Sequence, residues 1–259
     1  TMKGDPVAAN LKLGGGVHGD HWRGALSELR LKTPLRRWDL SSPWALDLDL
    51  PRQRLVMGDL CLGSQGASLC VKGSQVSAAQ GTLEFALSEF DLKRLRPWLP
   101  DNFRWQAMLS ADGRASWRGN QPTLHAVVRT TPGTFVADGL KTDYQQLALA
   151  LDFERQQAAI RLDFASKQIG NIDTDLLIRE PAGRGLLGGQ LKFDDLKLNT
   201  FAPLIPEVRS LQGIISADAR FDGTLAAPLL FGQLNLRDGE VQTHSDMVTL
   251  TKLVTRLKI

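Results

Sequence analysis

Apolar and polar residues alternate along most of this chain, and the alternation is its dominant pattern. Leu46-Asp47-Leu48-Asp49-Leu50 and Ile160-Arg161-Leu162-Asp163-Phe164 are two clear examples. A period of two places every apolar side chain on one face of a β-strand. Turn-forming clusters such as Gly14-Gly15-Gly16 separate the runs, at a spacing of about 8–12 residues. The pattern predicts an all-β, antiparallel chain with almost no helix.

Two short segments, 91–100 and 197–206, break the alternation and are predicted to form one or two helical turns, each stopped by proline. They also reveal an internal repeat of about 81–135 and 188–241. Six residues recur 106 positions later: Leu92, Leu95, Pro97, Pro100, Pro122 and Gly133 correspond to Leu198, Phe201, Pro203, Pro206, Pro228 and Gly239. Such repeats favour a stacked, quasi-one-dimensional architecture. We expect one continuous repetitive segment over residues 1–259, although one or two β-sandwiches remain an alternative.

The two cysteines lie symmetrically about a predicted turn at Gln65-Gly66. A hairpin centred on this turn places Cys61 directly opposite Cys70. A non-hydrogen-bonded pair in such a hairpin has the Cα separation that a disulfide requires. We therefore predict a disulfide between Cys61 and Cys70, with two buried free thiols as the alternative. A disulfide indicates an oxidising compartment such as the bacterial periplasm.

Composition and motifs favour no catalytic or nucleic-acid-binding class. The chain is 42% hydrophobic and 23% charged with a net charge of +3, too balanced for a dedicated nucleic-acid binder. Gly14-Gly15-Gly16-Val17-His18-Gly19 matches a dinucleotide fingerprint but precedes no predicted helix, so no cofactor is expected. His18, Asp20 and His21 do not share a strand face, so no metal site is expected either. No nucleophile and base can be paired, and the sequence predicts a protein that is not an enzyme.

Several segments together resemble the TamB / AsmA-like family of Gram-negative bacteria, and they cover nearly the whole chain. The resemblance to the C-terminal region of this family rests on segments 188–206, 211–217 and 221–239. Trp22-Arg23-Gly24, Trp44-Ala45-Leu46 and the cysteine hairpin resemble an upstream stretch of the same family. The resemblance implies a long curled, taco-like antiparallel β-sheet with an apolar concave groove.

The resemblance also implies a location and partners. Longer relatives are anchored in the inner membrane by an N-terminal helix that this chain lacks, so the chain is expected to be a periplasmic segment. Relatives bridge the inner and outer membranes, are implicated in phospholipid transport and partner TamA, an outer-membrane barrel. Because the chain stops inside an alternating run at Leu250–Leu253, we do not expect this segment to bind TamA directly.

The sequence thus predicts a non-enzymatic lipid conduit that holds phospholipid acyl chains in a groove. The expected groove residues are Leu46, Leu48, Leu50, Leu83, Phe85, Leu87, Leu149, Leu151, Phe153, Ile160, Leu162, Phe164, Leu191 and Phe193. Their charged neighbours, such as Asp49, Arg161 and Lys192, are expected to point to water. One alternative is a scaffold for outer-membrane protein assembly that adds a client strand to a sheet edge. The other is a purely structural β domain with a filled interior.

Overall fold

The computed structural model of the chain describes residues 8–33, 36–73, 75–137, 140–204, 208–243 and 249–258. Within them the predicted all-β class is confirmed, since antiparallel strands of a large open sheet account for most residues. A separate three-stranded sheet and two short 3₁₀ helices complete the described structure. The chain divides into two compact units, which are described in turn.

Unit 1 comprises Thr1–Trp98, Met108–Val128 and Phe153–Arg155. On one side, the long strand β2 pairs with β1. On its other side, the first half of β2 pairs with β4 and the second half pairs with β3. From β4 the pairing continues to β5 and β8, and from β3 it continues through β6, β7, β9 and β11. The elements are β1 (Ala8–His18), β2 (His21–Lys32), β3 (Arg37–Leu40), β4 (Trp44–Asp49), β5 (Arg54–Met57), β6 (Leu60–Ser64), β7 (Ala67–Lys72), β8 (Gln75–Ser77), β9 (Gln80–Asp91), η1 (Leu92–Trp98), β11 (Met108–Arg118) and β12 (Gln121–Thr130).

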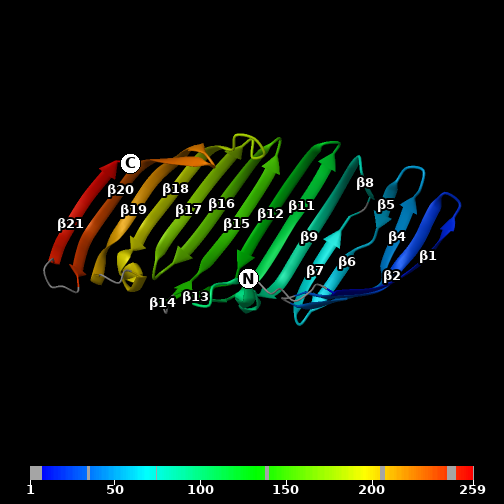
Figure 1. Cartoon of the computed structure of the whole chain (residues 1–259), viewed down its shortest axis with the longest axis horizontal. Coiled ribbons are helices and arrows are strands. Elements are labelled where there is room, and N and C mark those ends of the chain that lie inside the picture. Colours follow the sequence, from blue (N-terminus) through cyan, green and yellow to red (C-terminus); the bar gives the residue numbers. More distant parts are fainter. Residues whose placement is uncertain are drawn as a thin grey trace. The chain divides into compact units, whose positions relative to one another are not determined.

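Unit 2 comprises Leu99–Ala107, Arg129–Asp152 and Gln156–Ile259. Strands β16 to β21 pair in sequence order, each antiparallel to the next, and lie side by side in Figure 1. Strands β10, β13 and β14 form the small separate sheet. The elements are β10 (Phe103–Gln106), β13 (Gly133–Ala137), β14 (Leu140–Tyr144), β15 (Gln146–Glu154), β16 (Gln157–Ser166), β17 (Gly170–Arg179), β18 (Leu186–Lys197), η2 (Leu198–Leu204), β19 (Val208–Thr224), β20 (Ala227–Thr243) and β21 (Thr249–Lys258).

The same order of elements occurs twice, 106 residues apart. The 3₁₀ helices η1 and η2 follow β9 and β18 at this offset, and both are seven residues long. Strands β9 and β18 each contain a register shift at a residue with positive φ, Glu89 at 53° and Asp195 at 54°. We propose on this basis that 81–135 and 188–241 are two copies of one repeat. The predicted match of Pro100 with Pro206 lies outside the described residues at its second position.

The copies differ where the first one is interrupted. At the repeat offset, β10 and β11 together correspond to the single 17-residue strand β19, and β12 and β13 correspond to the 17-residue strand β20. The interruptions fall at Ala107 and at Thr131-Pro132. Proline lacks the N–H that an interior ladder position needs. The two short strands that these interruptions separate from β11 and β12 are β10 and β13, and they pair with each other in the small sheet.

Candidate functional site

Strand register gathers apolar side chains on one face of β16 to β20 in unit 2. Leu162 lies opposite Thr174, and Thr174 lies opposite Leu191. Residues that face each other in an antiparallel pair project from the same side of the sheet. The apolar face of unit 2 is defined as Ile160, Leu162, Phe164, Ile172, Leu176, Leu191, Phe193, Ala217, Ala219 and Leu234.

The opposite face of the same strands carries charges that form pairs, between neighbouring strands or along one strand. Arg161 Nε donates to Asp175 Oδ1 at 2.7 Å, and Lys192 Nζ donates to Asp194 Oδ2 at 2.9 Å. These hydrogen bonds, followed by the coulombic attraction of the same carboxylates, raise the pKa of Arg161 and the pKa of Lys192. The two faces of this part of the sheet are therefore chemically distinct, and a register slip of one residue would exchange them.

Unit 1 has an apolar face of the same kind. Val71 lies opposite Phe85, which lies opposite Gly113. Further along the unit, Trp22 lies opposite Leu48. The apolar face of unit 1 is defined as Trp22, Leu46, Leu48, Leu55, Leu69, Val71, Leu83, Phe85 and Leu87. The register thus places the predicted residues of β4 and β9 with further apolar side chains that the prediction did not name.

Glycines on this face make room for neighbouring aromatic rings. A Cβ on Gly113 would lie 2.5 Å from Phe85 Cζ, and a Cβ on Gly81 would lie 2.4 Å from Trp117 Cζ2. Both glycines are the register partners of the rings that cover them. Trp117 also donates Nε1–H to the Ser77 carbonyl oxygen at 2.9 Å. The rings therefore lie against the backbone of the adjacent strand instead of standing above it.

The predicted groove residues remain partly accessible to solvent. Ile160, Leu162, Leu191 and Phe193 are half-buried, as are Leu46, Leu48, Leu83, Phe85, Leu87, Leu151 and Phe153. Leu149 is 39% exposed in β15, and Leu50 is 44% exposed. Leu50 follows the last residue of β4 and belongs to a turn, so the alternation does not extend to it. A half-buried apolar face is available to bind a further apolar molecule.

Asp49 was expected to point to water, and this prediction is wrong. The residue is only 3% exposed, and it closes the turn between β4 and β5. Its Oδ1 accepts the backbone N–H of Arg52 at 3.0 Å, while Arg52 Nη1 donates to its Oδ2 at 3.0 Å. These bonds lower the pKa of Asp49, with the backbone hydrogen bond as the largest cause. The alternation predicted its face correctly but could not show the turn that buries it.

The small sheet of unit 2 covers one predicted groove residue, which the sequence did not reveal. The ring of Tyr144 in β14 lies 5.9 Å from the ring of Phe164, centroid to centroid. Tyr144 is 2% exposed, and its hydroxyl oxygen accepts from Trp105 Nε1 and Thr130 Oγ1, each at 3.0 Å. Phe135 contacts the other side of this cluster. Phe164 therefore packs in an aromatic cluster at one end of the apolar face of unit 2.

The predicted disulfide is present on the face of unit 1 opposite its apolar face, which is called the charged face of unit 1. Cys61 and Cys70 are register partners in the β6–β7 hairpin, and a disulfide joins them with a Cα separation of 4.1 Å. Cys70 lies opposite Ala86, and the next residues on its side, Lys72 and Glu84, also face each other. The disulfide therefore cross-links the two strands of the hairpin on the face opposite Val71 and Phe85.

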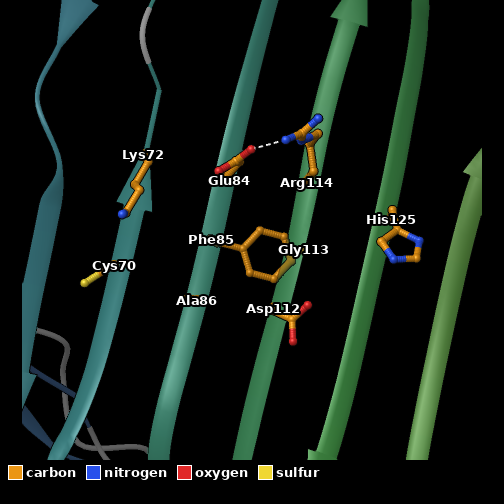
Figure 2. Close-up of a pocket in the computed structure, with 9 residues that line it drawn as sticks. All are labelled: Cys70, Lys72, Glu84, Phe85, Ala86, Asp112, Gly113, Arg114 and His125. Carbon is orange, nitrogen blue, oxygen red and sulfur yellow. Dashed lines mark hydrogen bonds and ion pairs between the residues drawn. The ribbon is translucent and has the colours of Figure 1, made fainter.

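A shallow pocket of about 660 Å³ lies over β7, β9, β11 and β12 in unit 1 (Figure 2). Most of its lining residues belong to the charged face: Cys70, Lys72, Glu84, Ala86, Asp112, Arg114 and His125, with Phe85 and Gly113 between them. Arg114 pairs with Glu84 across the pocket, and Lys72 pairs with Asp59 at 3.3 Å. These charges compensate each other, so the pocket does not select for one sign of ligand.

The residues that resembled a metal or cofactor site do not converge. Gly14, Gly15 and Gly16 lie within β1, and a strand follows where a dinucleotide fold requires a helix. His21 Nδ1 lies 2.6 Å from Asp47 Oδ1, and Arg23 Nε donates to the other oxygen of Asp47 at 2.9 Å. Among the described residues no cluster of three metal-ligating side chains occurs, and no described helix is long and apolar enough to cross a membrane.

Comparison with known proteins identifies the family of this chain. Residues 1–236 match the family model described as "TamB, N-terminal domain". Over 260 aligned residues the chain is 24% identical to the translocation and assembly module subunit TamB of Haemophilus influenzae, covering 96% of this chain and 20% of that relative. The chain thus spans about a fifth of the relative's length. No solved structure matches it.

The family comparison also changes one expectation. The sequence motifs were placed in the C-terminal region of the family, whereas the matching model describes the N-terminal domain. Alternating strands with short turns recur along a repetitive protein, which makes its segments resemble one another. The match nevertheless covers well over half of the residues, and the chain belongs to the TamB family.

Proposed function

We propose that this chain is a periplasmic segment of a lipid transport protein that carries phospholipid between the inner and outer membranes. The proposal assigns no catalytic step to it. The observation that carries the proposal is the apolar face of unit 2, on which apolar side chains follow one another across five neighbouring strands and are half-buried on all of them except β19. Membership in the TamB family supports an envelope role.

The physical basis of lipid binding is the transfer of acyl chains out of water. Each buried CH₂ group contributes about 0.8 kcal/mol, so a chain of about 16 carbons contributes on the order of 10 kcal/mol before entropic costs. Leucine, isoleucine and phenylalanine side chains bind such chains without preference for a position. A lipid can therefore move along the face without a deep minimum that would trap it.

The segment is proposed to work within a longer protein, anchored in the inner membrane and partnered by a TamA-like outer-membrane barrel. The Haemophilus influenzae relative is a translocation and assembly module subunit, and this similarity supports a role in a multi-subunit assembly. The ion-paired charged faces, such as Arg161 with Asp175 and Arg114 with Glu84, suit a surface that stays in contact with water.

An alternative is a scaffold that adds a client strand during outer-membrane protein assembly. Strand β1 favours this alternative, because Leu11 and Val17 are each 63% exposed and Leu13 is 50% exposed. A client strand would bind through its backbone at a sheet edge, whereas a lipid would bind to side chains in the middle of a face.

Native mass spectrometry of the purified chain distinguishes the two functions. The lipid proposal predicts adducts of phospholipid mass that disappear after delipidation and return on addition of phospholipid. A matched pair of variants locates them: Leu191→Asp should reduce the adducts, whereas Gln190→Asp, on the opposite face, should not. Absence of phospholipid from the wild-type chain before and after reconstitution would overturn the lipid proposal.

A further inference from the structure

One arginine of unit 1 is buried and forms no ion pair with any described residue. Arg36 is 6% exposed, and its guanidinium lies against the rings of Trp38 and Phe90, at 5.9 Å and 5.7 Å from their centroids. Its Nη2 donates to the carbonyl oxygen of Gln65 at 3.1 Å. Its Nε and Nη1 are buried, and no described residue accepts a hydrogen bond from either.

The surroundings add a second positive charge. Arg94 of η1 donates to the side-chain oxygen of Gln65, so two guanidinium groups converge on this one residue at the tip of the β6–β7 hairpin. The carboxylate of Asp91 attracts Arg36, and its Oδ1 accepts the backbone N–H of Lys93 at 3.0 Å. Among the described residues Asp91 forms no ion pair with Arg36.

This arrangement is costly unless an anion completes it. A buried guanidinium with unused donors loses its hydration without full replacement, and an unpaired buried charge is strongly destabilising. Burial, followed by the repulsion of Arg94, lowers the pKa of Arg36. Two rings provide cation–π attraction, but they accept no hydrogen bond in the plane of the guanidinium. That plane has the fork geometry that binds phosphate oxygens in pairs.

The site lies on the apolar face of unit 1 at the ends of its strands. Trp38 lies opposite Leu31, and Phe90 lies opposite Leu109. A phosphate held by Arg36 would therefore have apolar side chains directly beside it. An amphiphile with a phosphate at one end and acyl chains at the other matches this juxtaposition of a buried cation and an apolar surface.

We propose that Arg36, with Arg94 beside it, forms a phosphate-binding site at the end of the apolar face of unit 1. The inference deepens the proposed lipid function, on which its assignment to a lipid headgroup rests. Arg36 donates through one edge of its guanidinium, the second N–H of Nη2 together with Nε or Nη1, and Arg94 of η1 adds electrostatic attraction beside it. Gln65 holds both guanidinium groups in place.

Two binding experiments on the purified chain test the proposal. The first compares short-chain phosphatidylglycerol with a diacylglycerol of the same acyl chains, which lacks the phosphate, by displacement of an apolar fluorophore. The wild-type chain should bind phosphatidylglycerol about tenfold more tightly or better, the range expected for charge-assisted hydrogen bonds. Arg36→Gln should bind the two lipids equally. Arg96 is an exposed arginine on the same 3₁₀ helix as Arg94, and the control variant Arg96→Gln should behave as wild type.

The second experiment uses inorganic phosphate alone. At constant ionic strength, phosphate should raise the melting temperature of the wild-type chain and of Arg96→Gln, and leave Arg36→Gln unchanged, because a ligand that binds only the folded state stabilises it. Arg36→Met is a second variant that tests the site if Arg36→Gln does not fold. It keeps an apolar stem between Trp38 and Phe90, and should melt higher than wild type in the absence of phosphate.

The outcomes separate this inference from the proposed function. If the wild-type chain and Arg36→Gln share the same preference for phosphatidylglycerol, the site is wrong while lipid binding stands. If neither lipid binds but phosphate stabilises only chains that keep Arg36, the anion site stands and the lipid function fails. Stabilisation by phosphate without a preference for phosphatidylglycerol supports a site for free phosphate and overturns the headgroup assignment. If phosphate stabilises no chain and no lipid preference exists, the inference is overturned.

Discussion

The ring of Phe85 in β9 covers Gly113, its register partner in β11, so closely that a Cβ at Gly113 would lie 2.5 Å from Phe85 Cζ. The same Cβ would also lie 2.5 Å from the carbonyl oxygen of His125. Glycine at this position lets the aromatic ring lie along the sheet.

Gly113→Ala should therefore destabilise the chain by about 1–3 kcal/mol, the cost of forcing a methyl group into a filled space. Urea denaturation followed by tryptophan fluorescence measures this free energy of unfolding. Gly14→Ala is the matched control, because nothing lies within 4 Å of the position where its Cβ would be. It should be neutral or slightly stabilising. Equal effects of the two substitutions would contradict the proposed role of Gly113.

The Cys61–Cys70 disulfide should stabilise unit 1 by about 2–3 kcal/mol, since it closes a short loop in the unfolded chain. The double variant Cys61→Ala/Cys70→Ala should unfold at a lower urea concentration by that amount. Adding a reductant should lower the stability of the wild-type chain and leave the variant unchanged. Before reduction, alkylation of the purified, oxidised protein should add no mass; two alkylated thiols would refute the bond.

The turn at Asp49 should make stability depend on pH. Hydrogen bonds from Arg52 lower the pKa of Asp49 in the folded chain, so the folded state binds this proton less readily than the unfolded state. The stabilisation is present above the unfolded pKa of about 3.9 and is lost as the pH falls through the lower folded pKa. Asp49→Asn should thus be less stable than wild type at neutral pH, and the difference should shrink below about pH 4.

Asp101→Asn is the control for this pH dependence, since Asp101 forms no hydrogen bond or ion pair within the described part of the chain. Its stability should follow that of wild type at every pH. The account of Asp49 fails if the difference between Asp49→Asn and wild type stays constant from pH 7 to pH 3.

Alternation along the sequence was sufficient to predict the two faces of most strands. Leu191 and Lys192 project to opposite sides as expected, and the symmetry about Gln65-Gly66 predicted the partner of Cys61. A period of two specifies the side of a residue but not what covers it. It could not show that Tyr144 packs on Phe164, because that contact depends on a separate small sheet.

Arg36 illustrates the same limit for the candidate site. In the sequence it is one of two adjacent arginines before a short strand, a pattern typical of an exposed turn. Its burial depends on Phe90 and on the tip of the β6–β7 hairpin, which are 54 and 29 residues away along the chain. The proline-stopped segment 91–100 indicated a turn here, but not that its Arg94 would approach Arg36.

A charge in the middle of the apolar face of unit 2 should block lipid binding without unfolding the protein. Leu191 is half-buried, so water can still reach an aspartate introduced there. Leu191→Asp should retain the cooperative unfolding transition, with a lower free energy of unfolding, and should bind phospholipid at least about tenfold more weakly, because an acyl chain must desolvate the charge. Gln190→Asp, on the charged face, should bind phospholipid as wild type does. Equal loss in both variants would indicate a general structural effect.

Photo-crosslinking at Leu149 and Asp152 shows which face of β15 a bound lipid contacts. The two residues lie in the same strand, both are exposed to solvent, and an odd separation places them on opposite faces. Because both positions are accessible to solvent, a difference in labelling between them shows which face of the strand the lipid contacts. With photoreactive residues at these positions, we expect phospholipid adducts at Leu149 and none at Asp152. Equal labelling at both positions, or none at either, would contradict a lipid-binding apolar face.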